Sequence, residues 1–305
     1  MTAPTSAGRA AIDVGRIGVW TGALGLMPAA RARGAVERIE ELGYGAIWYP
    51  EPVGGKESLT HAALLLGWSE RIVIASAIAN IWARDAIAMA NAGRTLTDAH
   101  PGRYLLGVGA SNEVSVPARG HEFGRPYSRM RSYLDAMDEA PYLGPEPAEP
   151  ARRILAALGP RMLALAGERS VGAHPYFVPV EHTAFAREIL GPGPLLAVEQ
   201  AVALTGDRAQ VRRLAAPQMD FYLGRRPYRA NLARFGWSEA DMDGGGSDAL
   251  LDAIVASGDV EAVRARVRAH LDAGADHVCI QPIGAEPDDP QLDQLERLAA
   301  ALIEA

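Results

Sequence analysis

The sequence contains a single cysteine, Cys279, which lies within an apolar run. A lone cysteine cannot form an internal disulfide, so we predict a buried thiol in a strand and no covalent cross-link. No stretch approaches about 20 uninterrupted apolar residues, so we expect nothing to span a membrane. The first sixteen residues also lack the apolar core of a secretory signal. We therefore expect a cytoplasmic chain in which residues 1–15 are disordered.

Basic residues are scattered, and they form no run. The formal net charge is -7, and nucleic-acid binding needs a concentrated positive face, so nucleic acid is excluded as an expected partner. No two histidines are spaced as metal ligands with acidic residues nearby to complete a ligand set, so we predict no metal site. The apolar fraction of 49% over 305 residues is enough for a large core that needs neither metal nor disulfide.

Short apolar runs alternate with helix-compatible segments along the chain. The runs are nearly continuous in apolar residues, which is typical of parallel strands buried on both faces. Eight strands in this rhythm predict an α/β fold, a closed (β/α)8 TIM barrel in which residues 1–305 form one domain. The predicted strands are residues 17–20, 46–49, 72–77, 104–108, 153–158, 171–178, 195–204 and 277–281.

Three segments interrupt this alternation. Residues 109–127 form a long connection after the fourth strand, and residues 141–150 form a proline-rich link before the fifth. Residues 225–247 are predicted to be irregular, ahead of helices at Asp248 and Asp259. Long loops in a compact domain are usually functional or disordered. Because active sites of such barrels lie at the carboxyl ends of the strands, we expect the first of these loops to cover the site.

An anion site is predicted at Gly159-Pro160-Arg161, directly after the fifth strand. Glycine followed by proline at the first helical position leaves backbone N–H groups facing outward, and the arginine adds a bidentate donor for a phosphate or carboxylate. An ordinary helix start with a solvated arginine is the alternative that the local sequence leaves open.

Three titratable side chains are candidates for function. Glu51 follows the second strand between Trp48 and Pro52, where a carboxylate is placed to transfer protons; a structural carboxylate bonded to backbone N–H groups is the alternative. His121 lies in the long loop and either donates a proton to the substrate or orders the loop. His174, on the sixth strand, is expected to hydrogen-bond the cofactor rather than only to pack.

Four segments resemble the luciferase-like superfamily and, within it, the deazaflavin (coenzyme F420)-dependent oxidoreductases. They are ELGYGAIW at 41–48, SAIAN at 76–80, PGRYLLGVG at 101–109 and ALGPRM at 157–162. The PGRYLLGVG segment is the most diagnostic of them, and the resemblance extends over about residues 17–281.

The resemblance implies further assignments. Ser76, Ala77 and Ile78 would back the central ring of the cofactor, with a non-prolyl cis peptide at Ser76–Ala77. The loop that flanks the ring would be formed by Gly109, Ala110 and Ser111, and the phosphate-binding turn by Leu158, Gly159, Pro160 and Arg161. Relatives of this kind are commonly homodimers, which is also the expectation here.

These features predict an oxidoreductase that moves a hydride between coenzyme F420 and a small organic substrate, with Glu51 and His121 handling protons. Two alternatives stay open: an FMN-dependent monooxygenase of the same superfamily, and a cofactor-binding homologue without turnover. Deazaflavin-dependent sugar-phosphate dehydrogenases place a histidine after the acidic residue of the second strand, where this chain has Pro52. We therefore expect a substrate other than a sugar phosphate.

Overall fold

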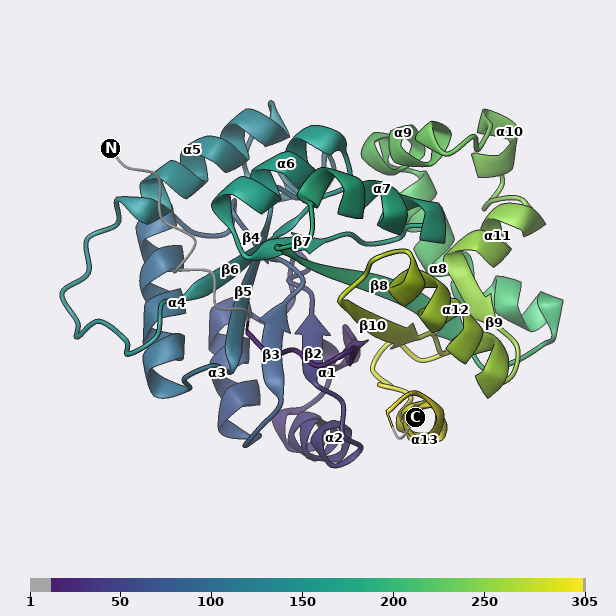
Figure 1. Ribbon diagram of the computed structural model, residues 1–305, viewed down its shortest axis with the longest axis horizontal. Coiled ribbons are helices and arrows are strands. Elements are labelled where there is room, and N and C mark those ends of the chain that lie inside the picture. Colours follow the sequence, from purple (N-terminus) through teal and green to yellow (C-terminus); the bar gives the residue numbers. More distant parts are fainter. Residues whose placement is uncertain (1–11, 304–305) are drawn as a thin grey trace.

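A computed structural model describes residues 12–303 and confirms the predicted TIM barrel. Eight parallel strands follow one another around the barrel, and the last strand pairs with both the first strand and the seventh, which closes the sheet (Figure 1). In barrel order they are β1 (Ile17–Trp20), β2 (Ala46–Tyr49), β3 (Val73–Ser76), β5 (Tyr104–Gly109), β6 (Arg152–Ala156), β7 (Gly172–His174), β8 (Leu195–Ala203) and β10 (His277–Pro282).

Strand β7 is the one that differs most from its predicted range of 171–178. It ends at His174 because Pro175 has no N–H to donate to a neighbouring strand. Phe177 then adopts a left-handed backbone conformation with φ 57°, which turns the chain away from the sheet. The chain thus leaves the sheet with Phe177 buried and Tyr176 partly exposed.

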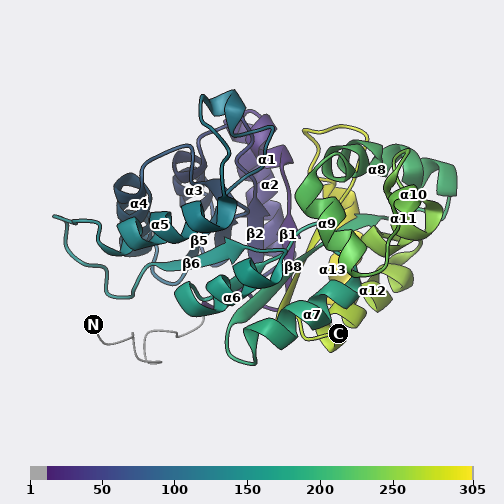
Figure 2. The same ribbon diagram turned by 90° about the horizontal axis from the view of Figure 1, so that it is seen from above.

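Helices surround the barrel on its outside, as Figures 1 and 2 show. The Asp85 carboxylate caps α4 by accepting a 2.9 Å bond from the Ala88 amide. The helices are α1 (Ala23–Leu26), α2 (Ala29–Glu41), α3 (Ser58–Gly67), α4 (Ala86–Ala99), α5 (Pro126–Asp138), α6 (Pro160–Arg169), α7 (Val180–Leu190), α8 (Arg208–Leu223), α9 (Arg226–Arg234), α10 (Glu239–Met242), α11 (Asp248–Ile254), α12 (Val260–Asp272) and α13 (Leu292–Leu302).

The prediction that residues 225–247 are irregular is wrong, because α9 and α10 occupy most of them. These helices gather beside α8 and α11 on one side of the molecule, on the right in Figure 2. Leu232 and Met242 are buried there in a second apolar cluster. Two short strands were also not predicted: β4 (Ala79–Asn80) pairs with β5, and β9 (Val255–Ser257) pairs with β8.

The chain before β1 packs against the barrel interior. Ile12 and Val14 are 4% and 3% exposed and belong to the same cluster as Trp48 and Cys279. The Gly15 carbonyl accepts a 2.8 Å bond from Nδ1 of His277. The prediction of disorder is therefore wrong for residues 12–15, where apolar burial fixes the chain, and for residues 1–11 it lies outside the described residues.

Cys279 is a buried thiol in a strand, as predicted, and its Sγ donates to the Val198 carbonyl at 3.3 Å. Burial raises the pKa of this thiol.

The link of residues 141–150 contains no helix or strand and extends away from the barrel, on the left of Figure 1. Among residues 12–303, no helix combines the length and apolar character needed to cross a membrane.

Candidate functional site

The order of the strands fixes which residues face one another across the barrel mouth. Counting in either direction around the barrel, β8 is the fourth strand from β3, and β10 is the fourth strand from β5. The strands are parallel, so their carboxyl ends meet at one end of the barrel. Residues after β3 and β5 therefore form one wall of the mouth, and residues of β8 and β10 form the wall across from it.

The first wall contains a non-prolyl cis peptide, Ala77–Ile78. The predicted position, Ser76–Ala77, is wrong by one residue. The Ala77 amide still donates to the Tyr49 carbonyl at 2.6 Å, so regular pairing continues through that residue and the cis bond follows it. The Ser76 side chain is fully buried and its Oγ donates to the Gly107 carbonyl at 2.8 Å. Ala77 and Ile78, which are partly exposed, thus form the surface that we term the shelf.

Gly109, Ala110 and Ser111 lie beside the shelf. A Cβ atom on Gly109 would stand 2.5 Å from Cγ1 of Ile78, so any other residue at this position would displace the Ile78 side chain. Ser111 has a left-handed backbone with φ 61°, which is uncommon for a residue other than glycine and is often found at functional sites. The structure therefore brings the predicted ring-flanking segment into contact with the shelf.

The predicted anion turn is the start of α6. Gly159 is its N-cap and provides no side-chain hydrogen bond, and Pro160 follows at the first helical position. Pro160 has no N–H and the Met162 amide donates to the Gly159 carbonyl at 3.1 Å, so the Arg161 amide is the one that this turn leaves for a ligand. A Cβ on Gly159 would meet nothing within 4 Å. Arg161 is exposed and stacks over the Tyr127 ring at 4.1 Å, and the Leu158 carbonyl accepts a 2.9 Å bond from His182. The turn is open and fixed in place.

Glu51 is engaged on every side. It forms an ion pair with Arg84, and the side chains of the two residues are 3% and 10% exposed. The amides of Asn80 and Ser58 donate to its carboxylate at 2.7 and 3.3 Å. Each carboxylate oxygen thus already accepts hydrogen bonds, which is the structural alternative that the sequence left open, and Glu51 ties the ends of β2 and β4 to α3.

His121 is exposed in the loop that follows β5. Its ring centroid lies 5.4 Å from that of Trp82, whose Nε1 donates to the Ala110 carbonyl at 2.9 Å. Its own amide donates to the Val116 carbonyl at 3.3 Å, within the loop. The Trp82 ring therefore lies between His121 and the Gly109–Ser111 segment that flanks the shelf. The His121 imidazole is exposed to solvent and accessible to a ligand.

His174 lies inside the barrel and is 2% exposed. Its ring stacks on Trp48 with centroids 4.6 Å apart, and its Nδ1 is 2.9 Å from the Ala197 carbonyl. A carbonyl accepts, so Nδ1 carries the proton, and burial lowers the pKa of His174 to about 4. Nε2 has no partner within residues 12–303 and is the one atom through which this histidine could meet a ligand.

Sequence reasoning missed the polar residues of the opposite wall. Tyr176, Gln218 and Gln281 are joined by hydrogen bonds, and Trp20 packs on the Tyr176 ring with centroids 5.0 Å apart. Glu199 lies on β8 beside them and is 2% exposed. The signal that could have found Glu199 is a charged residue, followed by the polar Gln200, inside the mostly apolar run LLAVEQAVA.

These features fit a flat, partly anionic cofactor. The shelf and Gly109 present backbone and apolar atoms, as a ring system requires, and the start of α6 presents the Arg161 amide and guanidinium for an anion. Buried polar atoms without a partner in the described part of the chain gather at the same end of the barrel: Trp20 Nε1, Glu199 Oε1 and Gln218 Oε1. No group of three or more histidine, cysteine or acidic residues within 12–303 is arranged to hold a metal ion.

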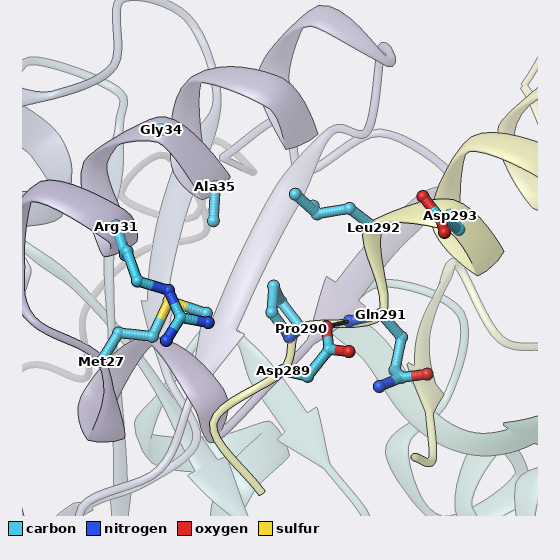
Figure 3. A pocket seen from close by; sticks show the side chains of 9 residues that line it. All are labelled: Met27, Arg31, Gly34, Ala35, Asp289, Pro290, Gln291, Leu292 and Asp293. Carbon is cyan, nitrogen blue, oxygen red and sulfur yellow. Dashed lines mark hydrogen bonds between the residues drawn. The ribbon is translucent and has the colours of Figure 1, made fainter. Parts of the chain in front are cut away.

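A separate surface pocket of about 340 Å³ lies between α2 and the segment that precedes α13 (Figure 3). Arg31 and Asp289 are among the residues that line it, and Arg31 forms a 3.1 Å ion pair with Asp288. None of the predicted site residues lines this pocket, so it is distinct from the barrel mouth.

Comparisons with known proteins agree with this architecture. The 5,10-methylenetetrahydromethanopterin reductase of Methanolobus tindarius is 23% identical over 288 residues, which cover 80% of this chain and 88% of the relative. An F420-dependent secondary alcohol dehydrogenase, solved with an F420-acetone adduct, has a TM-score of 0.73 at 14% identity and covers 94% of this chain and 98% of its own.

A third similar protein is the FMN-bound oxygenating constituent of 3,6-diketocamphane monooxygenase from Pseudomonas putida, with a TM-score of 0.69 at 16% identity over 94% of this chain and 97% of its own. At such identities the two structures show a shared fold. The luciferase-like monooxygenase family itself matches residues 10–277. That match spans far more than half of the sequence and confirms the resemblance seen in the four motifs, so the chain belongs to the luciferase-like monooxygenase family.

Proposed function

We propose that this luciferase-like enzyme binds coenzyme F420 at the barrel mouth and transfers a hydride between it and a small organic substrate. The observation that carries the proposal is the pairing of two surfaces at one end of the barrel. The Ala77–Ile78 shelf with Gly109 suits a planar ring, and the uncapped start of α6 suits an anionic tail.

Residues of the chain hold the two ends of the cofactor in this proposal. Ile78 and Gly109 support one face of the ring, so the substrate approaches from the other face. The amide and the guanidinium of Arg161 bind the phosphate, since the guanidinium is exposed and forms no ion pair with any described carboxylate. A bound deazaflavin supplies the ring carbon that accepts or donates the hydride.

His121 is the residue that we propose for proton transfer to the substrate. Its imidazole is exposed beside Trp82. Glu51, the other candidate, is held in its ion pair with Arg84, so in this proposal it stabilises the β2 and β4 ends. Replacement of His121 should therefore lower turnover more than it lowers cofactor affinity.

FMN is the alternative cofactor, and the similarity to an FMN-bound monooxygenase supports it. The similarity to a secondary alcohol dehydrogenase that is F420-dependent by name supports coenzyme F420. A direct comparison of the two cofactors decides between them.

The test is a fluorescence titration of the purified protein with F420 and, separately, with FMN. We expect saturable F420 binding with a dissociation constant in the micromolar range or below, and FMN binding at least about tenfold weaker. Tight binding of FMN with none of F420 would reverse the assignment. A protein that binds neither would contradict the proposed site.

A further inference from the structure

Three polar side chains cross the wall formed by β7, α8 and β10. Gln218 Nε2 donates to Tyr176 Oη at 2.8 Å, and Tyr176 Oη donates to Gln281 Oε1 at 2.7 Å. We term these three residues the mouth row. Each is partly exposed, so a ligand in the barrel mouth can reach them, and Gln218 Oε1 has no partner in the part of the chain that the structure describes.

Glu199 lies behind the mouth row. Its Oε2 accepts a 3.1 Å bond from the Phe177 amide, and its Oε1 has no partner among residues 12–303. Gln218 is the side chain that interacts with its carboxyl group, and this interaction and the Phe177 amide each lower the pKa of Glu199. Burial is the larger effect and raises the pKa to about 8, so at neutral pH the group is protonated and has an O–H to donate. The unpartnered Oε1 of Gln218 is then an acceptor for it.

The groups around Glu199 carry no charge either. They are Tyr176 after β7, Tyr222 on α8, Tyr228 on α9 and Cys279 on β10, and burial raises the pKa of each. The guanidinium of Arg225 stacks over Phe221 at 3.8 Å and acts on Tyr222 and Tyr228 rather than on Glu199.

We propose that the mouth row binds an uncharged hydrogen-bonding group of the substrate, a carbonyl or a hydroxyl, and that Glu199 is the positioning residue that holds the row through Gln218. A substrate carboxylate or phosphate at this wall would lose its hydration without gaining a cation, so the wall selects against anionic substrates. This inference rests on the proposed function, because it places the substrate across the mouth from the cofactor shelf.

The test uses the full chain saturated with F420 and two probes of equal carbon number, 2-pentanone and 4-oxopentanoate. Calorimetric titration should show 2-pentanone binding at least about tenfold more tightly, since only the second probe carries a carboxylate. Tyr176→Phe should weaken ketone binding by about fivefold to tenfold, and Tyr142→Phe, in the link of residues 141–150, should leave it unchanged.

The positioning role of Glu199 has its own readout. Ketone affinity of the wild type should fall as the pH rises through about 8, because an unpaired anion then forms behind the row. Glu199→Gln keeps a neutral donor of the same shape, so its affinity should stay constant over that range. A residue needed only for folding would leave the two pH profiles parallel.

The outcomes separate this inference from the proposed function. Failure of F420 to bind overturns the proposed function before either probe is added. Normal F420 binding with equal or tighter binding of 4-oxopentanoate overturns the inference alone. The same holds if the ketone does not bind, if Tyr176→Phe matches Tyr142→Phe, or if Glu199→Gln keeps the alkaline loss of affinity.

Discussion

Gly109 leaves room for the side chain of Ile78, and the shelf depends on that room. A Cβ at this position would lie 2.5 Å from Cγ1 and 2.8 Å from Cδ1 of Ile78, and 3.3 Å from Cβ of Ala156. We predict that Gly109→Ala pushes Ile78 toward the ring position and weakens F420 binding by about tenfold or more. Overpacking of this kind should also cost about 1–3 kcal/mol of the free energy of unfolding.

Ile78→Ala provides the matched second change, because it removes both atoms that the new methyl group would strike. The double variant should recover stability relative to Gly109→Ala, and the recovery measures the coupling of the two positions. Chemical denaturation and F420 titration of the four proteins check both effects. Additive losses would contradict a shelf shaped by this contact.

At the same scale, the family resemblance implied the segments of the shelf and of Gly109, with the cis bond one residue too early, and the local sequence indicated the start of α6 at Gly159-Pro160, because each is a short motif next to a strand end. Sequence reasoning did not show the partner of Glu51: Arg84 stands 33 positions away and belongs to a different strand–helix unit. It also did not assemble Tyr176, Gln218 and Gln281, which come from three separate segments and meet only when the barrel closes. Spacing along a chain carries no information about such neighbours.

The N-cap of helix α6 allows capping of the helix to be separated from binding of an anion. Gly159 is its N-cap, with a φ of −88° and open space around the missing Cβ, so other residues fit there without strain. Aspartate and asparagine are both favourable N-caps, and both variants should keep the stability of the protein within about 1 kcal/mol. They differ in charge, and this difference separates helix capping from anion binding.

Gly159→Asp places a carboxylate where we propose that the phosphate binds, so we expect F420 affinity to fall by at least about tenfold. Gly159→Asn, which has nearly the same shape, should retain most of the affinity. Fluorescence titration of the two variants makes the comparison. Equal affinities would show that the anionic tail binds elsewhere.

The strands were the elements that the sequence predicted best, because the eight apolar runs are clear and the sheet is parallel throughout. The ends were less certain: Pro175 and the left-handed Phe177 cut β7 to three residues. Helices α9 and α10 were not predicted since Gly236 and Gly244 interrupt the pattern there, and the apolar residues that hold the helices in place, Leu232 and Met242, are too few to give a periodic signal.

For the whole molecule, the buried histidines determine how stability depends on pH. Burial lowers the pKa of four of them to about 4 and of one to about 3, from an ordinary value of 6.5. These five stay neutral in the folded chain and take up protons in the unfolded chain below pH 6.5, so stability is lost as the pH falls from about 6.5 toward 4. They are His61, His174, His182, His277 and His270.

Glu199 acts in the opposite direction. Its pKa is raised from 4.5 to about 8, so the unfolded chain releases this proton first and stability declines as the pH rises through that range. Below pH 6.5 the five histidines outweigh this one carboxyl group. As the pH falls, the histidines alone lower the free energy of unfolding by up to about 7 kcal/mol per pH unit.

We therefore predict greatest stability near neutral pH and unfolding between about pH 6 and pH 4, because the total stability of such domains is only about 5–15 kcal/mol. Thermal unfolding followed by circular dichroism at successive pH values checks this. A melting temperature that stays constant from pH 7 down to pH 4 would contradict the buried, neutral state of the histidines.

Ile17 of β1 lies beside Val278 of β10. Strand β1 is synthesised before the other barrel strands, but it can pair with β10 only after nearly the whole chain has been made. Until then both edges of the growing sheet carry unpaired amides and carbonyls, which are templates for pairing with other copies of the chain. A truncation just before β10 would make that exposure permanent, and such a fragment should aggregate rather than fold to a smaller barrel.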